Sequence, residues 1–392
     1  MPNLPTGFRK LGQAAPILAL VGAAIFAVGF MAARTDTLDQ FWQAYFYGWL
    51  FWTTISLGCM LWMLVLHTVK AKFAFPVIRP FEVGATMLPL MFVLLIPILA
   101  FGLPYLYPWV NHVQVAASVP MAHRAGYMNP AWFAIRNIFY FALFGAITWL
   151  LRQSSKRQDS SGDFAESWFR SSVAAVSVVL FVLTVTLAIT DWVMSLDPLW
   201  FSTIYGFLWC DYAGLGAMAL ICAMVGLQSR GEPYRSAMDY DVTRDLGNLL
   251  FLFIMVWGYF SFSQWIIVWS GNLPHEIHYF LIRNQGQLLP LGAFIVVGEF
   301  FVPFIALLSS RLKRTPRMLA GISLWILMMR VLELHWVVMP MWHPYVLNVT
   351  ALEVGAWLAF AGIWFTAFSI ELKRAGVVPR HATAVMEVAQ HA

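Results

Sequence analysis

Charged side chains are scarce in this chain. Asp, Glu, Lys and Arg make up 11% of its 392 residues, and hydrophobic residues make up 60%. A soluble domain carries about 25% charged residues, so this composition excludes an ordinary soluble fold and predicts an integral membrane protein. The net charge of +5 comes from short segments between apolar runs and does not indicate binding to nucleic acid.

Cysteine is also scarce, and its spacing excludes the common cysteine-bound redox centres. Cys59, Cys210 and Cys222 all lie in apolar runs, without the close pairs that hold an iron–sulfur cluster or attach a haem. A haem held by two histidines needs both at matching depth, but His67 and His335 fall near opposite ends of their apolar runs. We therefore expect no haem, iron–sulfur cluster or other metal site in this chain.

What the chain has in abundance is long apolar runs. A membrane span needs roughly 20 mostly apolar residues. Ten such runs predict an all-α polytopic membrane protein with a single membrane domain over 1–392, with spans near 14–33, 44–68, 81–102, 131–151, 169–190, 201–227, 246–270, 288–309, 317–338 and 348–371. The proline-rich connection 103–130 is expected to form a structured lid.

Basic residues are distributed unequally between the two faces that these spans define. Lys and Arg gather on one face, which we call the basic face, at 9–10, 70–79, 152–157, 230–244, 311–317 and 373–380. The opposite face has only Arg34, Arg124 and Arg283. Because basic loops stay on the cytoplasmic side, this pattern predicts that the basic face and both termini are cytoplasmic. The first apolar run lacks a clear cleavage site, so no signal peptide is expected.

Four ionisable residues fall deep within the predicted spans: Asp211, Glu299, Arg330 and Glu333. Each charge at membrane depth costs about 2.5–3.5 kcal/mol on insertion scales, and such residues are often functional. Arg330 and Glu333 are three residues apart and can pair on one helix face. In one interpretation this pair fixes helix packing, while Ser, Tyr or Trp donors satisfy Asp211 and Glu299. In the other, the acids and His335 line a route for protons.

The segment Asp191-Trp-Val-Met-Ser-Leu-Asp-Pro-Leu-Trp-Phe-Ser-Thr-Ile-Tyr-Gly206 joins two spans at the opposite face. Its mixture of acids, hydroxyls and aromatic rings is suited to a ring-shaped ligand such as a quinone. The quinone-site candidates here and at the ends of the last two spans are Asp191, Trp192, Asp197, Ser202, Tyr205, His335, Trp336 and His343. The alternatives are that the aromatics anchor the protein at the membrane interface and that Asp197-Pro198 begins the next helix.

This segment resembles the signature of the F subunit of bacterial alternative complex III, in the polysulfide-reductase (NrfD-like) family of membrane subunits. Arg330-Val-Leu-Glu-Leu-His-Trp336, followed by Pro340, is similar to a second motif of that family. Asp191 and Asp197 match the acids of the first motif, and Arg330 and Glu333 match the pair of the second. Leu199 departs from the pattern, where the family more often has His.

The resemblance implies two four-helix bundles plus two extra helices. It also implies a subunit of a quinol:electron-acceptor (cytochrome c) oxidoreductase in the respiratory chain of a bacterial inner membrane. Such a subunit contributes to quinol binding or proton translocation and is not catalytic alone. Its implied partners are lipid, a homologous ten-span subunit, and iron–sulfur and multihaem cytochrome c subunits on the outer face.

A secondary transporter or channel with a polar path is the alternative from another class. Transporters often have helices broken at corresponding positions of two halves. The third and eighth predicted spans do carry Pro89, Pro97, Pro290 and Pro303, but no paired glycine-rich break accompanies them.

Overall fold

The computed structural model describes residues 4–32, 37–69, 72–198 and 200–380. Across these residues all regular secondary structure is helical, and ten helices are long and apolar enough to cross a membrane. The predicted fold class, an all-α polytopic membrane protein, is therefore confirmed. Arg34, Lys70 and Leu199 lie outside the described residues.

Seven of the spans are built on one long helix each. They are α1 (Thr6–Ala32), α2 (Thr37–Val69), α8 (Pro130–Ser161), α9 (Ala165–Trp192), α10 (Tyr205–Leu227), α12 (Tyr240–Gly271) and α18 (Ala351–Ala375). The third span is α3 (Ile78–Ala85), α4 (Leu88–Pro97), the π-helical η2 (Ile98–Gly102) and α5 (Leu103–Leu106). The eighth is α14 (Leu288–Ile295), the π-helical η5 (Val296–Phe301) and α15 (Val302–Leu308). The ninth is α17 (Pro316–Val338), continued by η6 (Met339–Met341).

Short helices form the connections. The segment 103–130 is structured, as expected, and contains η3 (Pro108–Val110), α6 (His112–Ala117) and α7 (Val119–Arg124) beyond the end of α5. The remaining short helices are η1 (Lys72–Ala74), η4 (Met194–Leu196), α11 (Tyr234–Ala237), α13 (Pro274–Leu281) and α16 (Ser310–Arg314).

Polar caps set several helix ends. Asn129 accepts a hydrogen bond from the Trp132 amide at 2.9 Å and is followed by Pro130 at the first helical position of α8. At its other end α8 stops at Gly162, whose φ of +70° is the left-handed conformation that favours glycine. The helix α10 begins at Tyr205 with Ile204 at its N-cap, so Asp197-Pro198 does not start this helix.

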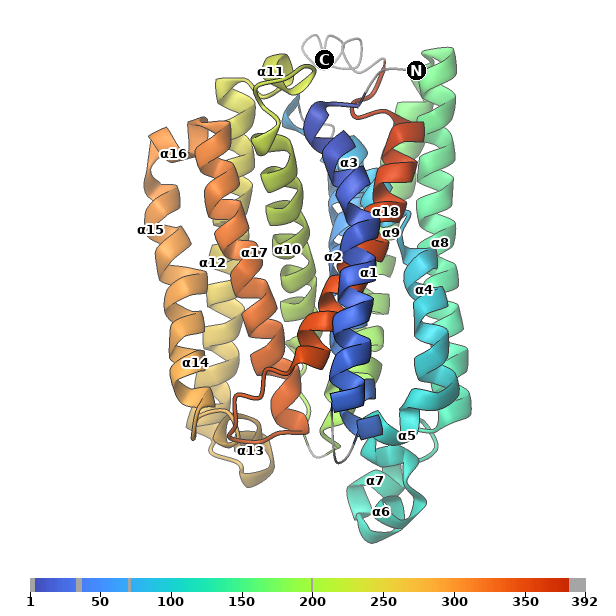
Figure 1. Ribbon diagram of the computed structural model, residues 1–392, viewed down its shortest axis with the longest axis vertical. Coiled ribbons are helices and arrows are strands. Elements are labelled where there is room, and N and C mark those ends of the chain that lie inside the picture. Colours follow the sequence, from blue (N-terminus) through green and yellow to red (C-terminus); the bar gives the residue numbers. More distant parts are fainter. Residues whose placement is uncertain (1–3, 33–36, 70–71, 199, 381–392) are drawn as a thin grey trace.

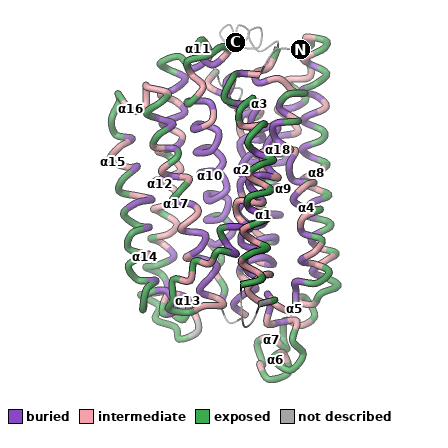
Figure 2. The backbone as a smooth tube through the Cα atoms, in the orientation of Figure 1, coloured by how far each residue is buried: buried purple, intermediate pink, exposed green. Residues whose placement is uncertain are grey.

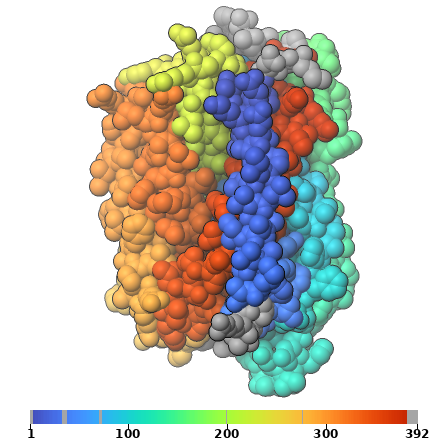
Figure 3. All heavy atoms as spheres, viewed as in Figure 1, coloured from blue at the N-terminus to red at the C-terminus, as the bar shows by residue number. Residues whose placement is uncertain are grey.

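The helices form two groups of four (Figure 1). The first bundle contains α2, the third span, α8 and α9, and the second contains α10, α12, the eighth span and α17. The two bundles meet where α2 packs on α10. The extra pair, α1 and α18, packs together beside α2, and α1 runs along the surface in Figure 3.

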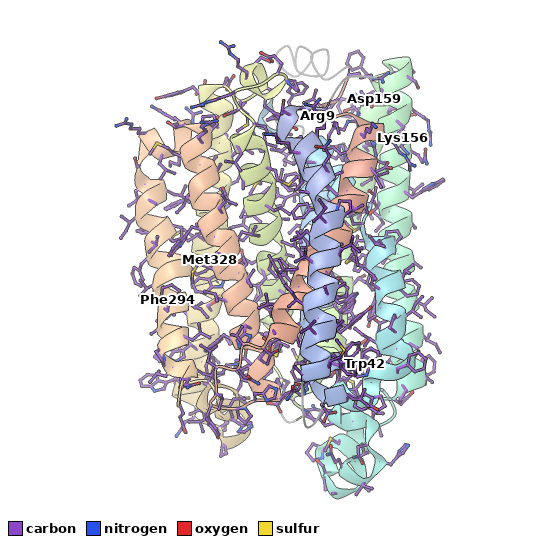
Figure 4. All side chains as sticks on the ribbon, in the orientation of Figure 1. Arg9, Trp42, Lys156, Asp159, Phe294 and Met328 are labelled. Carbon is purple, nitrogen blue, oxygen red and sulfur yellow. The ribbon has the colours of Figure 1, made fainter. Side chains whose placement is uncertain are left out.

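The centre and the edges of this arrangement differ in burial. The α2 and α10 tubes are mostly buried, whereas α12, α14 and α15 at one edge carry many exposed residues (Figure 2). Arg9 and Lys156 lie at the same end of the molecule, and Trp42 lies near the other end (Figure 4). Basic segments from distant parts of the chain therefore share one face, as the charge pattern predicts.

The contact between the bundles depends on Gly58 of α2. A Cβ atom at this position would lie 1.8 Å from the Ala213 carbonyl oxygen on α10. No such distance is tolerated, so one helix would have to move.

We predict that Gly58→Ala lowers thermal stability in detergent, at a cost of about 1–3 kcal/mol or more from overpacking. Gly145→Ala on α8 is the matched control, because a Cβ atom there meets nothing within 4 Å. Equal melting temperatures for the two variants would show that the close contact between the bundles is not as described.

Candidate functional site

The most unusual site lies inside the second bundle, around Arg330 of α17. Its Nη2 atom lies 2.8 Å from Oε1 of Glu299 and also contacts Oε2 of Glu333. The pairing of Arg330 with Glu333 on one helix face is confirmed. Glu299 is 0% exposed and belongs to η5, one of the π-helical segments that recur at functional sites.

A third acid, Asp211 of α10, lies close enough to interact electrostatically with Arg330, Glu333 and Glu299. It is 3% exposed, and neither carboxyl oxygen has a hydrogen-bond partner among the described residues. The interpretation in which Ser, Tyr or Trp donors satisfy Asp211 and Glu299 is therefore wrong for both, because Glu299 is paired with Arg330 and accepts no such hydrogen bond among the described residues. Such a donor does serve Glu333, whose Oε1 accepts a 2.7 Å hydrogen bond from Trp257 Nε1.

The cluster is unbalanced in charge. It places three carboxyl groups around one guanidinium, and the aromatic ring of Tyr212, 4.8 Å from the guanidinium carbon, adds no full charge. An uncompensated charge is strongly disfavoured in an apolar interior. Arg330 can balance only one of the three acids, so two carboxyl groups have no compensating cation among the described residues.

Two cavities meet at Glu333. The larger has a volume of about 660 Å³ and lies among α10, α12, α13, the eighth span and α17. The smaller, about 30 Å³, lies between α2, α10 and α17, where Thr54, Tyr212 and Arg330 line it. It has room for about one or two water molecules. Glu333 and Tyr212 line both cavities, and the smaller one also reaches Thr54 and Arg330.

Asp191 and Trp192 from the 191–206 segment lie elsewhere, inside the first bundle. Asp191 is 0% exposed and accepts hydrogen bonds from Arg136 Nε at 2.8 Å and from the Tyr140 hydroxyl at 2.9 Å. Trp192 donates to Asn137 Oδ1 at 2.6 Å. Both residues tie α9 to α8, and neither lines the cavities at Glu333.

The middle of the segment, from Met194 to Phe201, contributes to the wall of a third cavity of about 280 Å³ at the opposite face, where Asp197 and Trp200 lie with Trp109 and α7. Arg124 of α7 donates to the Pro198 carbonyl at 2.7 Å and so fixes the lid to the segment. Tyr205 is buried, with its ring centroid 5.0 Å from that of Trp200. Ser202 is half-buried and lines none of these three cavities.

The remaining quinone candidates are dispersed. His335 Nδ1 lies 3.1 Å from Glu353 Oε2, and His343 Nε2 lies 3.0 Å from Gln43 Oε1. Partial burial lowers the pKa of His343, which lies beyond the ninth span. Trp336 lines the larger cavity. The structure thus brings together the four proton-path candidates but divides the quinone candidates among several places.

A further buried network, centred on Glu82, was not predicted from the sequence. Glu82 accepts hydrogen bonds from Arg79 at 2.9 Å and from Arg152 at 3.2 Å, and its other oxygen lies 3.1 Å from His67 Nε2. The charge pattern assigns both arginines to loops, but α3 begins at Ile78 and α8 continues to Ser161, so both lie in helices. Arg79 and Glu82 are three residues apart, a spacing that could have indicated the pair.

Among the residues that the structure describes, no group of three or more His, Cys, Asp or Glu side chains is placed to hold a metal ion. Compared with known proteins, the chain matches no protein-family model and no curated protein.

We predict that Asp191→Ala strongly destabilises the protein. Removing one partner of a buried ion pair costs about 3–5 kcal/mol, because the other charge is left uncompensated. Thermal unfolding in detergent measures the loss. The control is Asp241→Ala, which removes an exposed partner of Arg244 and should cost about 0–1 kcal/mol. Equal effects would contradict a structural role for the Asp191–Arg136 pair.

Proposed function

We propose that this chain is a membrane subunit, without a redox metal of its own, of a quinol:electron-acceptor oxidoreductase in a bacterial respiratory chain. In this proposal it resides in the inner membrane and contributes proton translocation and quinol binding to the complex. The observation that carries the proposal is the charge-unbalanced cluster of Asp211, Glu299 and Glu333 around Arg330. The two sequence motifs described above support the type of complex.

The geometry explains how the cluster would handle protons. Because Arg330 contacts Glu299 and Glu333 together, it stabilises whichever carboxyl group is ionised while the other holds a proton. Water in the 30 Å³ cavity would link Glu333 to the polar groups between the bundles. Asp211 has no hydrogen-bond partner among the described residues and would serve as a neutral proton store beside them. Proton exchange then needs only small movements of side chains and water.

In the proposed complex, other subunits supply the electron acceptor. Oxidation of a quinol needs an electron acceptor, and the resemblance assigns that role to iron–sulfur and multihaem cytochrome c subunits on the opposite face. A homologous ten-span subunit would lie beside this one. The chain on its own is then not an enzyme, and its work is measurable only in the assembled complex.

A secondary transporter or channel is the second candidate, and one observation is consistent with it. The third and eighth spans each contain a π-helical segment near a proline, at Ile98–Gly102 after Pro97 and at Val296–Phe301 before Pro303. Irregular helix inside a membrane often lines a path for ions or small solutes. The same irregularity would also serve a proton path, so it does not separate the two functions.

Purification in mild detergent tests the complex. We expect an iron–sulfur protein and a multihaem cytochrome c to co-purify with the chain at fixed ratio. Recovery of the chain without either protein would contradict the redox proposal and favour the transporter.

Reconstitution of that complex in liposomes tests the proton path. We expect Glu299→Gln to reduce protons moved per quinol oxidised at least several-fold, because the amide cannot bind and release a proton. Glu232→Gln, at an exposed acid of the basic face, should leave the ratio unchanged. An unchanged ratio in Glu299→Gln, with assembly intact, would contradict proton conduction through the cluster.

A further inference from the structure

The larger cavity has the size and lining of a ligand site. Its volume of about 660 Å³ falls within the roughly 300–1,000 Å³ of known small-molecule pockets. Most of its wall is apolar and aromatic, with Trp257 and Phe300 among the rings. It lies entirely in the second bundle, away from Asp191 and Trp192.

A few polar atoms interrupt this apolar wall. Gln264 is 5% exposed, and its Oε1 atom has no hydrogen-bond partner in the part of the chain that the structure describes. The Ser261 hydroxyl and Trp336 Nε1 are likewise unpaired and line the cavity, together with the Glu333 carboxyl group. An unpaired buried polar group costs about 1–3 kcal/mol, so a ligand that completes these hydrogen bonds would be favoured.

The chemistry of these atoms defines the ligand. Trp336 Nε1 can only donate, whereas Gln264 Oε1 can only accept. The Glu333 carboxylate accepts from Trp257 yet keeps further lone pairs. A matching ligand is an uncharged ring with one oxygen that accepts and one hydroxyl that donates. An acyl chain would leave all these groups unsatisfied.

The cavity is accessible from the lipid side. Tyr259 and Phe262 of α12 and Leu289 and Val296 of the eighth span line it and are exposed on the molecule's surface. Both elements lie at the apolar edge of the second bundle (Figures 1 and 2). A ligand with an apolar tail could therefore enter between them and leave its tail in the bilayer.

We propose that this cavity, and not the 191–206 segment, binds the ring of a lipid-phase quinol. Trp336 Nε1 donates to one ring oxygen, and the other ring hydroxyl donates to Gln264 Oε1 or to the Glu333 carboxylate. This inference rests on the proposed function and names the place and the residues of its quinol contact. It also sets the ring directly against the acid cluster, since Glu333 belongs to both.

Binding to the full chain in phosphatidylcholine nanodiscs tests the site. The probe is decylubiquinone, and its reduced form under anaerobic conditions, titrated by quenching of tryptophan fluorescence. We expect saturable binding, and Ala293→Phe should raise the Kd at least tenfold because it fills the cavity from an exposed lining position. Ala142→Phe, at an exposed position of α8 in the first bundle, is the matched control and should leave the Kd unchanged.

Two further variants test the hydrogen bonds. We expect Trp336→Phe to weaken binding of both forms about fivefold, the effect of losing one hydrogen bond of about 1 kcal/mol. Gln264→Leu should weaken binding of the reduced form only, because only the hydroxyl donates. Decylbenzene, which has a ring and tail but no oxygens, should compete poorly.

Three outcomes would overturn the inference: no saturable binding to the wild-type chain, equal binding by Ala293→Phe and its control, or competition by decylbenzene as strong as by decylubiquinol. The proposed function is judged separately, because it depends on co-purification and on proton movement in Glu299→Gln. If the wild-type chain binds quinol tightly and Ala293→Phe leaves the Kd unchanged, the site lies elsewhere in the same subunit.

Discussion

The contact of Arg330 with two carboxyl groups is the constraint on which the rest of the second bundle depends. The Arg330 guanidinium links α17 to η5 through its ion pair with Glu299. Its second ion pair, with Glu333, lies within α17 itself. Removing charges from water costs several kcal/mol per ion, and only close pairing offsets it. With Asp211 added, one cation faces three acids. A cluster of this kind persists in an apolar interior only if protons or cations complete it, and that requirement is the physical basis of the proposed function.

The two bundles use buried charge differently. In the first bundle, acids are enclosed by donors: Asp191 by Arg136 and Tyr140, and Glu82 by Arg79 and Arg152. These networks hold helices together and leave no acid without a partner. In the second bundle, Asp211 lacks a hydrogen-bond partner and Glu333 borders a large cavity. The first bundle therefore holds these acids in closed networks of donors. The second bundle has an acid without a hydrogen-bond partner and an acid at the wall of a large cavity.

The spans and the basic face could be predicted from the sequence because both depend on local composition. The Arg330–Glu333 pair could be predicted because its two residues are three apart on one helix. By contrast, the Asp191–Arg136 and His335–Glu353 pairs join residues far apart in the chain. Only the packing of helices brings such partners together, so the sequence could not show that the first two residues of the 191–206 segment pair with α8. The cavity beside Glu333 was also beyond prediction, since its wall comes from five separate elements.

In the proposed function, the cluster carries protons because its acids outnumber its cation. Infrared spectroscopy of the chain in membranes at neutral pH observes this directly, through the carbonyl stretch of protonated carboxyl groups. We expect such a band in the wild-type protein. Asp211→Asn should reduce the band, and Glu232→Asn at the surface should leave it unchanged. A wild-type spectrum without a protonated carboxyl band would contradict this proposal. A band that stays unchanged in Asp211→Asn, in Glu299→Gln and in Glu333→Gln would also contradict it.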